Sequence, residues 1–399
     1  MDIRSNEPFW LIKNELPQSY PSLQKSISAD VLIVGAGITG ALIAYRLLEE
    51  GKKIVMVDSR DICNGSTAAS TSMLQYEIDV PLHKLIEQVG LTNAVSSYQN
   101  CEKSIKDIEK IVKDVGSNCG FEYKKSVYFT SSKKDIPFLK KEFDARAEHG
   151  FKVKWLEKED LNKLGLDAYA AIESQSGATM DVYRLANDIL NHCQNKGVEI
   201  YDRTIIKESK TKNNKVVAAT KAGFTIEVND VLRCTGYEST ETISEKIVDL
   251  KSTFALASEA FDLLPKAFKD RIYWNTDSPY LYFRSTDDGR IVMGGGDRDF
   301  KNAKRRDALL PKKEKELTKS FKKCFPDINF IADYSWAGTF GETKDGLPYF
   351  GKPDKEENEH YILGYGGNGI TFSVMGMEAV VHSINKTPHP YLEYYKFDR

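Results

Sequence analysis

The hydrophobic pattern is clearest near the start of the chain, where its period changes twice. Residues 31–34 (VLIV) are uniformly apolar, which is typical of a strand buried on both faces of a parallel sheet. Apolar residues then recur every three or four positions up to Gly51, which predicts a helix that ends there: Ala41, Ile43, Ala44, Leu47, Leu48. Residues 53–58 (KIVMVD) predict a second buried strand, so the segment reads as strand, helix, strand.

Other stretches predict elements of a second kind. Residues 82–116 carry a helical period, residues 123–132 read as a strand, and residues 278–296 predict a hairpin that turns at Asp-Asp-Gly. Residues 311–326 predict a basic amphipathic helix with one apolar face: Leu317, Phe321, Cys324, Phe325. Its basic face could dock an acidic partner, or the helix could simply cover a sheet.

Within the hairpin, YLYFR has the period of two of a strand. Tyr280, Tyr282 and Arg284 fall on one face, and Leu281 and Phe283 fall on the other.

The turn between the first strand and the first helix carries the pattern GxGxxG. Gly35 permits a tight turn, Gly37 lets backbone approach a pyrophosphate, and Gly40 lets helix pack on strand. Ile38 and Thr39 open the helix, whose N-terminus would face the phosphates. Asp58, at the end of the second strand, can accept from a ribose hydroxyl, and its charge argues against Arg60 as a 2′-phosphate ligand. These features predict a Rossmann-like dinucleotide site.

Three later segments favour FAD over a nicotinamide cofactor. Residues 63–75 are rich in small hydroxyl side chains that could follow a phosphate or ribityl chain. A strand within 227–239 ends at Thr235 and Gly236, where backbone can approach a cofactor again. Residues 360–380 run from a strand through a glycine loop into a helix beginning near Ile370, whose dipole would stabilise a reduced flavin.

In this order the segments resemble the D-amino-acid oxidase superfamily of FAD enzymes, which includes glycine oxidase, sarcosine oxidase and the γ-glutamylputrescine oxidases. The N-terminal PFWL and YPSL look most like the γ-glutamylputrescine branch. The resemblance implies an α/β (α+β) fold in which a Rossmann-like FAD-binding domain is interleaved with a substrate domain of mixed β-sheet plus helices. The expected FAD domain is 1–82, 151–250 and 330–399, and the expected substrate domain is 83–150 and 251–329.

The resemblance also implies the cofactor contacts. Asp58, followed by Ser59 and Arg60, would hold the adenosine ribose, Ile206 would meet the adenine, and Thr235 and Gly236 would pass the pyrophosphate. The residues expected along the flavin are Ser66, Thr67, Ser70, Ser72, Met73, Gly338, Gly367, Asn368, Gly369, Ile370 and Thr371. Sarcosine oxidase-like relatives attach FAD through a cysteine in the segment matching 336–351, which has none here, so non-covalent FAD is expected.

The segment WAGTFGETKDGLPYFG, residues 336–351, departs from the family. Phe340 stands where amino-acid-oxidising members carry an arginine that grips the substrate carboxylate, and Gly367 stands at a second arginine position. A buried carboxylate without a cation is costly, so an α-amino acid is a poor candidate substrate. Phe340 would instead form an apolar wall. Glu342 could receive a remote ammonium or be a solvated turn residue, and Asp345 is expected to form a turn.

Two residues of the hairpin have open roles. Tyr280 matches a family tyrosine that touches substrate, or it is a half-buried strand tyrosine. Arg284 could bind a distant carboxylate or form a structural salt bridge. Val292 replaces a family lysine that helps oxygen react, which leaves oxidase and dehydrogenase open.

The function implied is oxidation of an amine C–N bond, in a polyamine or secondary amine, by hydride transfer to flavin N5. The imine then hydrolyses, and O2 or another acceptor takes the electrons. Alternatives are a D-amino-acid or N-methyl amino-acid oxidase or dehydrogenase using Arg284, a non-catalytic flavin redox sensor, and a nicotinamide enzyme.

Composition narrows these possibilities only slightly. A net charge of −2 over 399 residues gives no argument for nucleic acid or an anionic membrane. The six cysteines lack a paired spacing and the six histidines lack a ligand spacing, so no metal and reduced thiols are expected. No signal peptide or transmembrane run is visible, which favours a cytoplasmic protein.

Overall fold

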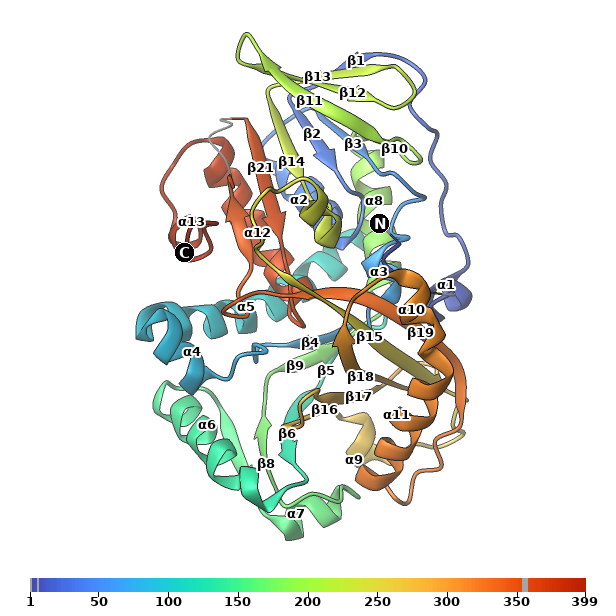
Figure 1. The fold of residues 1–399 in the computed structure, drawn as a ribbon, viewed down its shortest axis with the longest axis vertical. Helices are drawn as coiled ribbons and strands as arrows, with labels where there is room; N and C mark the ends of the chain where they lie inside the picture. Colours follow the sequence, from blue (N-terminus) through green and yellow to red (C-terminus); the bar gives the residue numbers. More distant parts are fainter. Residues whose placement is uncertain (1, 6, 354–357) are drawn as a thin grey trace.

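The computed structural model describes residues 2–5, 7–353 and 358–399, and two large sheets organise it (Figure 1). The upper one has six strands in the order β10-β3-β2-β14-β21-β20: Glu199–Tyr201, Ile54–Val57, Val31–Val34, Asp230–Arg233, Glu359–Leu363 and Tyr349–Gly351. Its strands are parallel except β20, which pairs antiparallel with β21. The uniformly apolar runs predicted as buried strands are β2 and β3.

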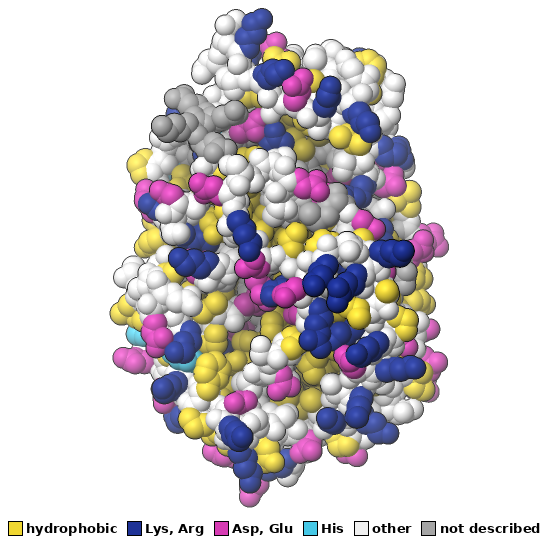
Figure 2. All heavy atoms as spheres, in the orientation of Figure 1, with side chains coloured by type: hydrophobic (Ala, Val, Ile, Leu, Met, Phe, Trp, Pro, Cys, Tyr) yellow, Lys and Arg dark blue, Asp and Glu magenta, His cyan; other side chains and the backbone are white. Residues whose placement is uncertain are grey.

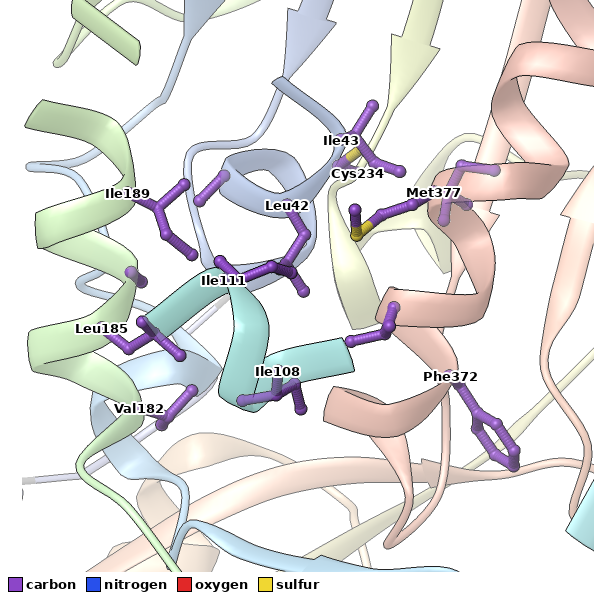
Figure 3. Close-up of a cluster of buried hydrophobic side chains, with 14 of the residues drawn as sticks. Leu42, Ile43, Ile108, Ile111, Val182, Leu185, Ile189, Cys234, Phe372 and Met377 are labelled. Atoms are coloured by element: carbon purple, nitrogen blue, oxygen red, sulfur yellow. The ribbon is translucent and has the colours of Figure 1, made fainter. Parts of the chain in front are cut away.

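Helices cover this sheet, and their packing explains the helical periods. The cluster in Figure 3 joins α2 (Ile38–Glu49), α5 (Leu91–Val115), α8 (Val182–Asn195) and α12 (Gly369–Ile384). Buried side chains from all four helices meet there, including Leu42, Ile108, Leu185 and Phe372. α2 ends where Gly51 adopts a φ of +65°, as predicted.

The lower sheet has eight strands in the order β19-β15-β18-β17-β16-β6-β8-β7. They are Ala332–Glu342, Asp249–Ser258, Ile291–Asp299, Leu281–Ser285, Arg271–Asn275, Lys125–Thr130, Ala170–Ser174 and Val153–Leu156. The predicted hairpin is β17 and β18, with Ser285 opposite Ile291, and the predicted strand in 123–132 is β6. The predicted period-2 faces also hold, because Leu281 and Phe283 enter the core while Tyr280 and Tyr282 face a cavity.

Two smaller sheets complete the fold. One has the order β1-β13-β12-β11: Ile27–Ser28, Thr225–Val228, Lys215–Thr220 and Ile206–Lys212. The other has the order β4-β9-β5: Met73–Gln75, Gly177–Thr179 and Glu122–Tyr123. The remaining helices are α1 (Phe9–Asn14), α3 (Ser66–Ala69), α4 (Leu82–Val89), α6 (Ile136–Glu148), α7 (Lys158–Lys163), α9 (Lys266–Lys269), α10 (Ala303–Ala308), α11 (Leu310–Cys324) and α13 (Pro390–Tyr394), with 3-10 turns at Lys133–Asp135 and Gly236–Glu241.

The predicted amphipathic helix is α11. Its apolar face, with Leu317, Phe321 and Cys324, is buried against the eight-stranded sheet, so the helix covers that sheet. Lys and Arg side chains gather over α10 and α11 on the face shown in Figure 2.

Several strands and one helix lie beside a different sheet from the one that the expected domain bounds suggest. β7 and β8 were expected in the FAD domain as part of 151–250, and β19 as part of 330–399, yet all three lie in the eight-stranded sheet. Conversely, α5 was expected in the substrate domain, yet it packs on α12 beside the six-stranded sheet. Long-range strand pairing determines which sheet β7, β8 and β19 join, and the apolar face of α5 determines where that helix packs. The division into two interleaved domains remains a prediction.

Candidate active site

A cavity of about 690 Å³ reaches from the ends of β2 and β14 to the eight-stranded sheet. Its lining comes from segments spread over most of the chain. One end is formed by the glycine turn and by Asp58, and the other by aromatic and acidic side chains.

The glycine turn has the close packing that its pattern predicted. Gly35 has a φ of +106°, and a Cβ on Gly40 would lie 1.9 Å from the Gly35 carbonyl oxygen, so neither position accepts a side chain. The Thr67 hydroxyl accepts a hydrogen bond from the Ile38 amide at 3.0 Å. The turn therefore exposes backbone without side chains at the N-terminus of α2, which is the arrangement that phosphate-binding helix ends have.

Asp58 is fixed by backbone donors. Its Oδ2 accepts from the Ala36 amide at 2.8 Å, and its Oδ1 accepts from the Arg60 amide at 2.9 Å. Burial raises the pKa of Asp58, and these two hydrogen bonds oppose the rise. Arg60 is ion-paired with Glu238, with Nη1 donating to Oε2 at 3.0 Å.

Two features at this end fit a bound dinucleotide. The Thr235 hydroxyl is buried in the lining and has no hydrogen-bond partner among the described residues. A buried hydroxyl of this kind usually has a partner, which in a cavity is a bound ligand or an ordered water. Gly369 and Ile370, at the start of α12, also line the cavity, and Asn368 makes no side-chain cap to that helix. The first amides of α12 are thus left for an anionic group.

At the other end, Asp79 reaches the glycine loop before α12. Its Oδ2 accepts from the Gly367 amide at 2.7 Å, and its Oδ1 accepts from the Tyr280 hydroxyl at 3.2 Å. A Cβ on Gly367 would lie 2.5 Å from Asp79 Oδ1. The bare glycine is therefore what lets this carboxylate approach. Burial raises the pKa of Asp79, although both hydrogen bonds lower it.

Asp297 enters the same end from a bulge in β18. Ser252 pairs with Arg298 and Phe254 pairs with Gly295, so β18 has one residue more than β15 between these pairs. Gly295 and Gly296 have φ values of +133° and +70°, which a bulge of this kind needs. The bulge aims Asp297 into the cavity near Thr253. Asp297 Oδ1 is buried without a hydrogen-bond partner among the described residues, and burial raises the pKa of Asp297 to about 7.

Aromatic side chains enclose the space beside the two carboxylates. The lining contains Trp274, Tyr280, Tyr282 and Phe340. Trp274 is 6% exposed and stacks on Tyr128 at 3.7 Å, yet its indole nitrogen has no partner among the described residues.

Comparison with known proteins agrees with this geometry. Residues 30–381 match the sequence model of the DAO family, which is described as FAD dependent oxidoreductase. The chain belongs to the DAO family of FAD-dependent oxidoreductases. FAD is therefore its cofactor, and the expected fold class is confirmed.

Individual relatives are distant. The chain is 23% identical to a putative Rieske 2Fe-2S iron-sulfur protein of Bacillus subtilis, over 96% of this chain and 74% of that one. It is also 23% identical to the γ-glutamylputrescine oxidoreductase of Escherichia coli, over 88% and 82%. The crystal structure of glycine oxidase from Geobacillus kaustophilus superposes with a TM-score of 0.77 and 17% identity, over 93% and 99% of the two chains.

Most residues expected to contact FAD or substrate line the cavity of this DAO-family chain. They are Gly35, Gly37, Ile38, Thr39, Asp58, Ser59, Arg60, Ser66, Thr67, Ser70, Met73, Ile206, Thr235, Gly236, Tyr280, Gly338, Phe340, Gly367, Gly369 and Ile370. Four others sit behind the lining: Gly40, Ser72, Asn368 and Thr371. Asn368, for example, donates to the carbonyls of Gln75 and Glu77 at 3.2 and 2.8 Å, and so holds the loop in place.

Arg284 and Glu342 lie outside the lining. Arg284 is 2% exposed, and its guanidinium donates to the carbonyls of Thr71 and Met180 at 2.7 and 2.8 Å. This arrangement is that of a structural arginine. Glu342 is exposed at the last position of β19 and pairs with Lys251 at 3.5 Å. Neither side chain lines this cavity.

Asp79 and Asp297 are functional candidates that the sequence interpretation missed. Asp79 belongs to no motif, and the three glycines before Asp297 were the one signal of a bulge. Val292 is fully buried in β18 and does not line the cavity.

The cavity thiols bear on how FAD is held. Cys63 and Cys234 line the cavity, and burial raises the pKa of Cys63 well above its ordinary value and that of Cys234 to about 12. Both thiols stay protonated and are poor nucleophiles. In the described part of the chain, all six cysteines are free, no cluster of His, Cys, Asp and Glu could hold a metal, and no helix is long and apolar enough to cross a membrane.

Proposed function

We propose that this DAO-family protein oxidises the C–N bond of an amine that lacks an α-carboxylate, with non-covalently bound FAD. The observation that carries the proposal is the pairing of Gly367 with Asp79. At this position the amino-acid-oxidising relatives are expected to have a cation, and this chain has a carboxylate in hydrogen-bond contact with the loop. A substrate carboxylate would meet repulsion there, whereas an amine would be stabilised.

FAD supplies the two-electron acceptor for the hydride that leaves the carbon beside the nitrogen. The imine that remains is hydrolysed by water to an aldehyde and a smaller amine or ammonia. The protein side chains have the remaining tasks, which are binding, orientation and exclusion of water.

Tyr280 is the main orienting residue in this proposal. Burial and the adjacent Asp79 raise its pKa far above the ordinary value, so the hydroxyl stays protonated and donates to Asp79. The Asp79 carboxylate is thereby fixed in place before an amine arrives. Phe340 walls the same space and packs against the apolar cluster that contains Tyr237.

The rival carboxylate-binding function would use Arg284. Because the guanidinium of Arg284 is buried against backbone carbonyls, we do not expect it to reach a substrate. O2 or another electron acceptor would reoxidise the flavin.

Anaerobic titration of the purified yellow protein tests the proposal. We expect 1,4-diaminobutane, γ-glutamylputrescine or related amines to bleach the flavin, and glycine, sarcosine and D-alanine to leave it oxidised. A carbonyl-trapping reagent should then detect the aldehyde. Bleaching by the amino acids alone would overturn the proposal, and a flavin reduced only by dithionite would indicate a redox sensor.

A further inference from the structure

The charges that line the cavity are divided between its two ends. Among the described lining residues, the cations are Arg60 and Arg233, both at the nucleotide end. Arg60 pairs with Glu238, and Arg233 donates to Glu359 at 2.6 Å. At the other end, the described lining contains Glu77, Asp79 and Asp297 and no cation. Glu77 is ion-paired with the buried Arg146 at 3.2 Å, behind the lining. Asp79 and Asp297 are therefore without a cation in the lining around them. The charge of Lys313, which pairs with Glu316 at 2.9 Å, and a hydrogen bond from Thr253 lower the pKa of Asp297, but burial raises it more.

When both carboxylates are ionised, this arrangement is unfavourable unless a cation enters. Both carboxylates are desolvated. The charge of Asp79 helps to raise the pKa of Asp297, and the charges of Asp79 and Asp297 both help to raise the pKa of Tyr280. Asp79 has two hydrogen-bond donors, but Asp297 Oδ1 has none among the described residues. A buried carboxylate gains most from a paired, hydrogen-bonding cation.

The surroundings suit an aliphatic chain that carries ammonium groups. The rings of Tyr280 and Tyr282 lie 5.8 Å apart, and Trp274 and Phe340 complete the aromatic lining. Aromatic faces attract ammonium groups and pack against methylenes.

The two carboxylates lie on different elements. Asp79 lies against the loop that leads into α12, and Asp297 projects from the bulge of β18. They therefore offer two separate binding points for ammonium groups. An amine with only one nitrogen would leave one of the two carboxylates without a cation.

We infer that the substrate is an aliphatic diamine or longer linear polyamine, with one nitrogen at Asp79 and a second at Asp297. This inference rests on the proposed amine oxidation and adds the charge and shape of the substrate. The nitrogen that reacts would pass its ammonium proton to a neighbouring carboxylate, which would leave the neutral amine that hydride loss to FAD requires. The second nitrogen remains an ammonium and anchors the chain.

Matched amines test the inference on the FAD-loaded protein. 1,4-Diaminobutane and n-butylamine have the same carbon chain and differ in the second amine. We expect the diamine to bind about 10- to 100-fold more tightly, the range that a charge-assisted hydrogen bond provides. Binding is measured from the concentration dependence of anaerobic flavin reduction and, independently, by calorimetry on the dithionite-reduced protein.

Variants locate the effect. Asp297→Asn should bring the ratio of the two affinities close to one, whereas Asp297→Glu, which keeps the charge, should retain much of it. Asp299→Asn is the matched control, because Asp299 lies at the exposed end of the same strand and pairs with Lys251 at 2.8 Å. It should leave the ratio unchanged.

The outcomes separate the two claims. Equal affinity of the wild-type protein for butylamine and diaminobutane, with the flavin reduced by both, would overturn this inference and leave amine oxidation standing. Failure of every amine to reduce the flavin would overturn both. The comparison of amines on the wild-type protein needs no variant, so it decides even if a variant fails to fold.

Discussion

Asp297→Asn should make the protein's stability depend less on pH. The pKa of Asp297 is raised by burial, first of all, from 3.8 to about 7, and the charges of Glu342 and Asp79 add to the rise, while Thr253 and Lys313 oppose it. Because the folded pKa exceeds the unfolded one, ionisation of Asp297 destabilises the folded protein. This group therefore costs nothing below about pH 4, and its cost grows as pH rises to 7.

The size of the effect follows from the same values. A tenfold change in a protonation equilibrium is about 1.4 kcal/mol. The full cost of ionising Asp297 in the folded, amine-free protein is thus at most about 4 kcal/mol above pH 7. Part of it is already present at pH 5.5, so the additional loss between pH 5.5 and pH 8.5 is about 2 kcal/mol. An asparagine amide at this position does not ionise, so the variant would avoid this loss.

Urea unfolding of the FAD-loaded proteins at the two pH values measures the difference. The advantage of Asp297→Asn over wild type should be larger at pH 8.5 than at pH 5.5. Asp299→Asn should show no such gain, because the pKa of Asp299 is lowered by Lys251, not raised. A constant difference between wild type and Asp297→Asn at both pH values would refute the account of Asp297 as a desolvated carboxylate.

Three further substitutions separate the roles of individual residues. Phe340→Arg should lose amine activity by at least about 10-fold through charge repulsion and lost packing; amine kinetics that survive intact would show that Phe340 does not shape the pocket. Gly367→Ala should weaken diamine binding by about 10-fold, because its Cβ would lie 2.5 Å from Asp79 Oδ1, and calorimetry on the reduced protein would show this. Arg284→Ala should lower the free energy of unfolding, measured in urea, by about 2–4 kcal/mol, because the buried carbonyls of Thr71 and Met180 lose their hydrogen-bond donor. In that variant the diamine-to-butylamine affinity ratio should stay as in wild type, and a changed ratio would restore Arg284 as a substrate ligand.

The nucleotide end could be predicted because its signals are local. The spacing of Gly35, Gly37 and Gly40, the apolar runs on either side and the acidic end of the second strand all fall within one strand-helix-strand unit. Each glycine has a backbone reason that a sequence pattern records. The structure reproduces these elements with nearly the expected boundaries.

The substrate end could be predicted only in part. The absence of an arginine at Phe340 and Gly367 suggested an amine, but the acidic partner was sought at Glu342, two residues along the same strand. Glu342 ends β19 in solvent and pairs with Lys251. Asp79 and Asp297 take that place in our proposal, and only the tertiary structure brings them to one cavity. A strand bulge and a close approach to Gly367 create this proximity, and neither has a short-range sequence pattern.

The sheet that each strand joins could not be predicted for a related reason. The resemblance implied that the segments containing β7, β8 and β19 belong to the FAD domain, whereas these strands pair into the eight-stranded sheet. Likewise, the apolar face of α5 predicted a helix but not which surface it would cover.

The central claim is that the cavity of this DAO-family protein binds a cationic amine through the carboxylates of Asp79 and Asp297. A crystal structure of the FAD-loaded protein, reduced with dithionite so that the ligand is not consumed, and soaked with 1,4-diaminobutane, tests it most directly. We predict one ligand nitrogen within about 3 Å of an Asp79 carboxylate oxygen and the other within about 3 Å of an Asp297 carboxylate oxygen. A diamine bound away from both residues, or a D-alanine carboxylate bound beside Phe340 in a parallel soak, would contradict the account.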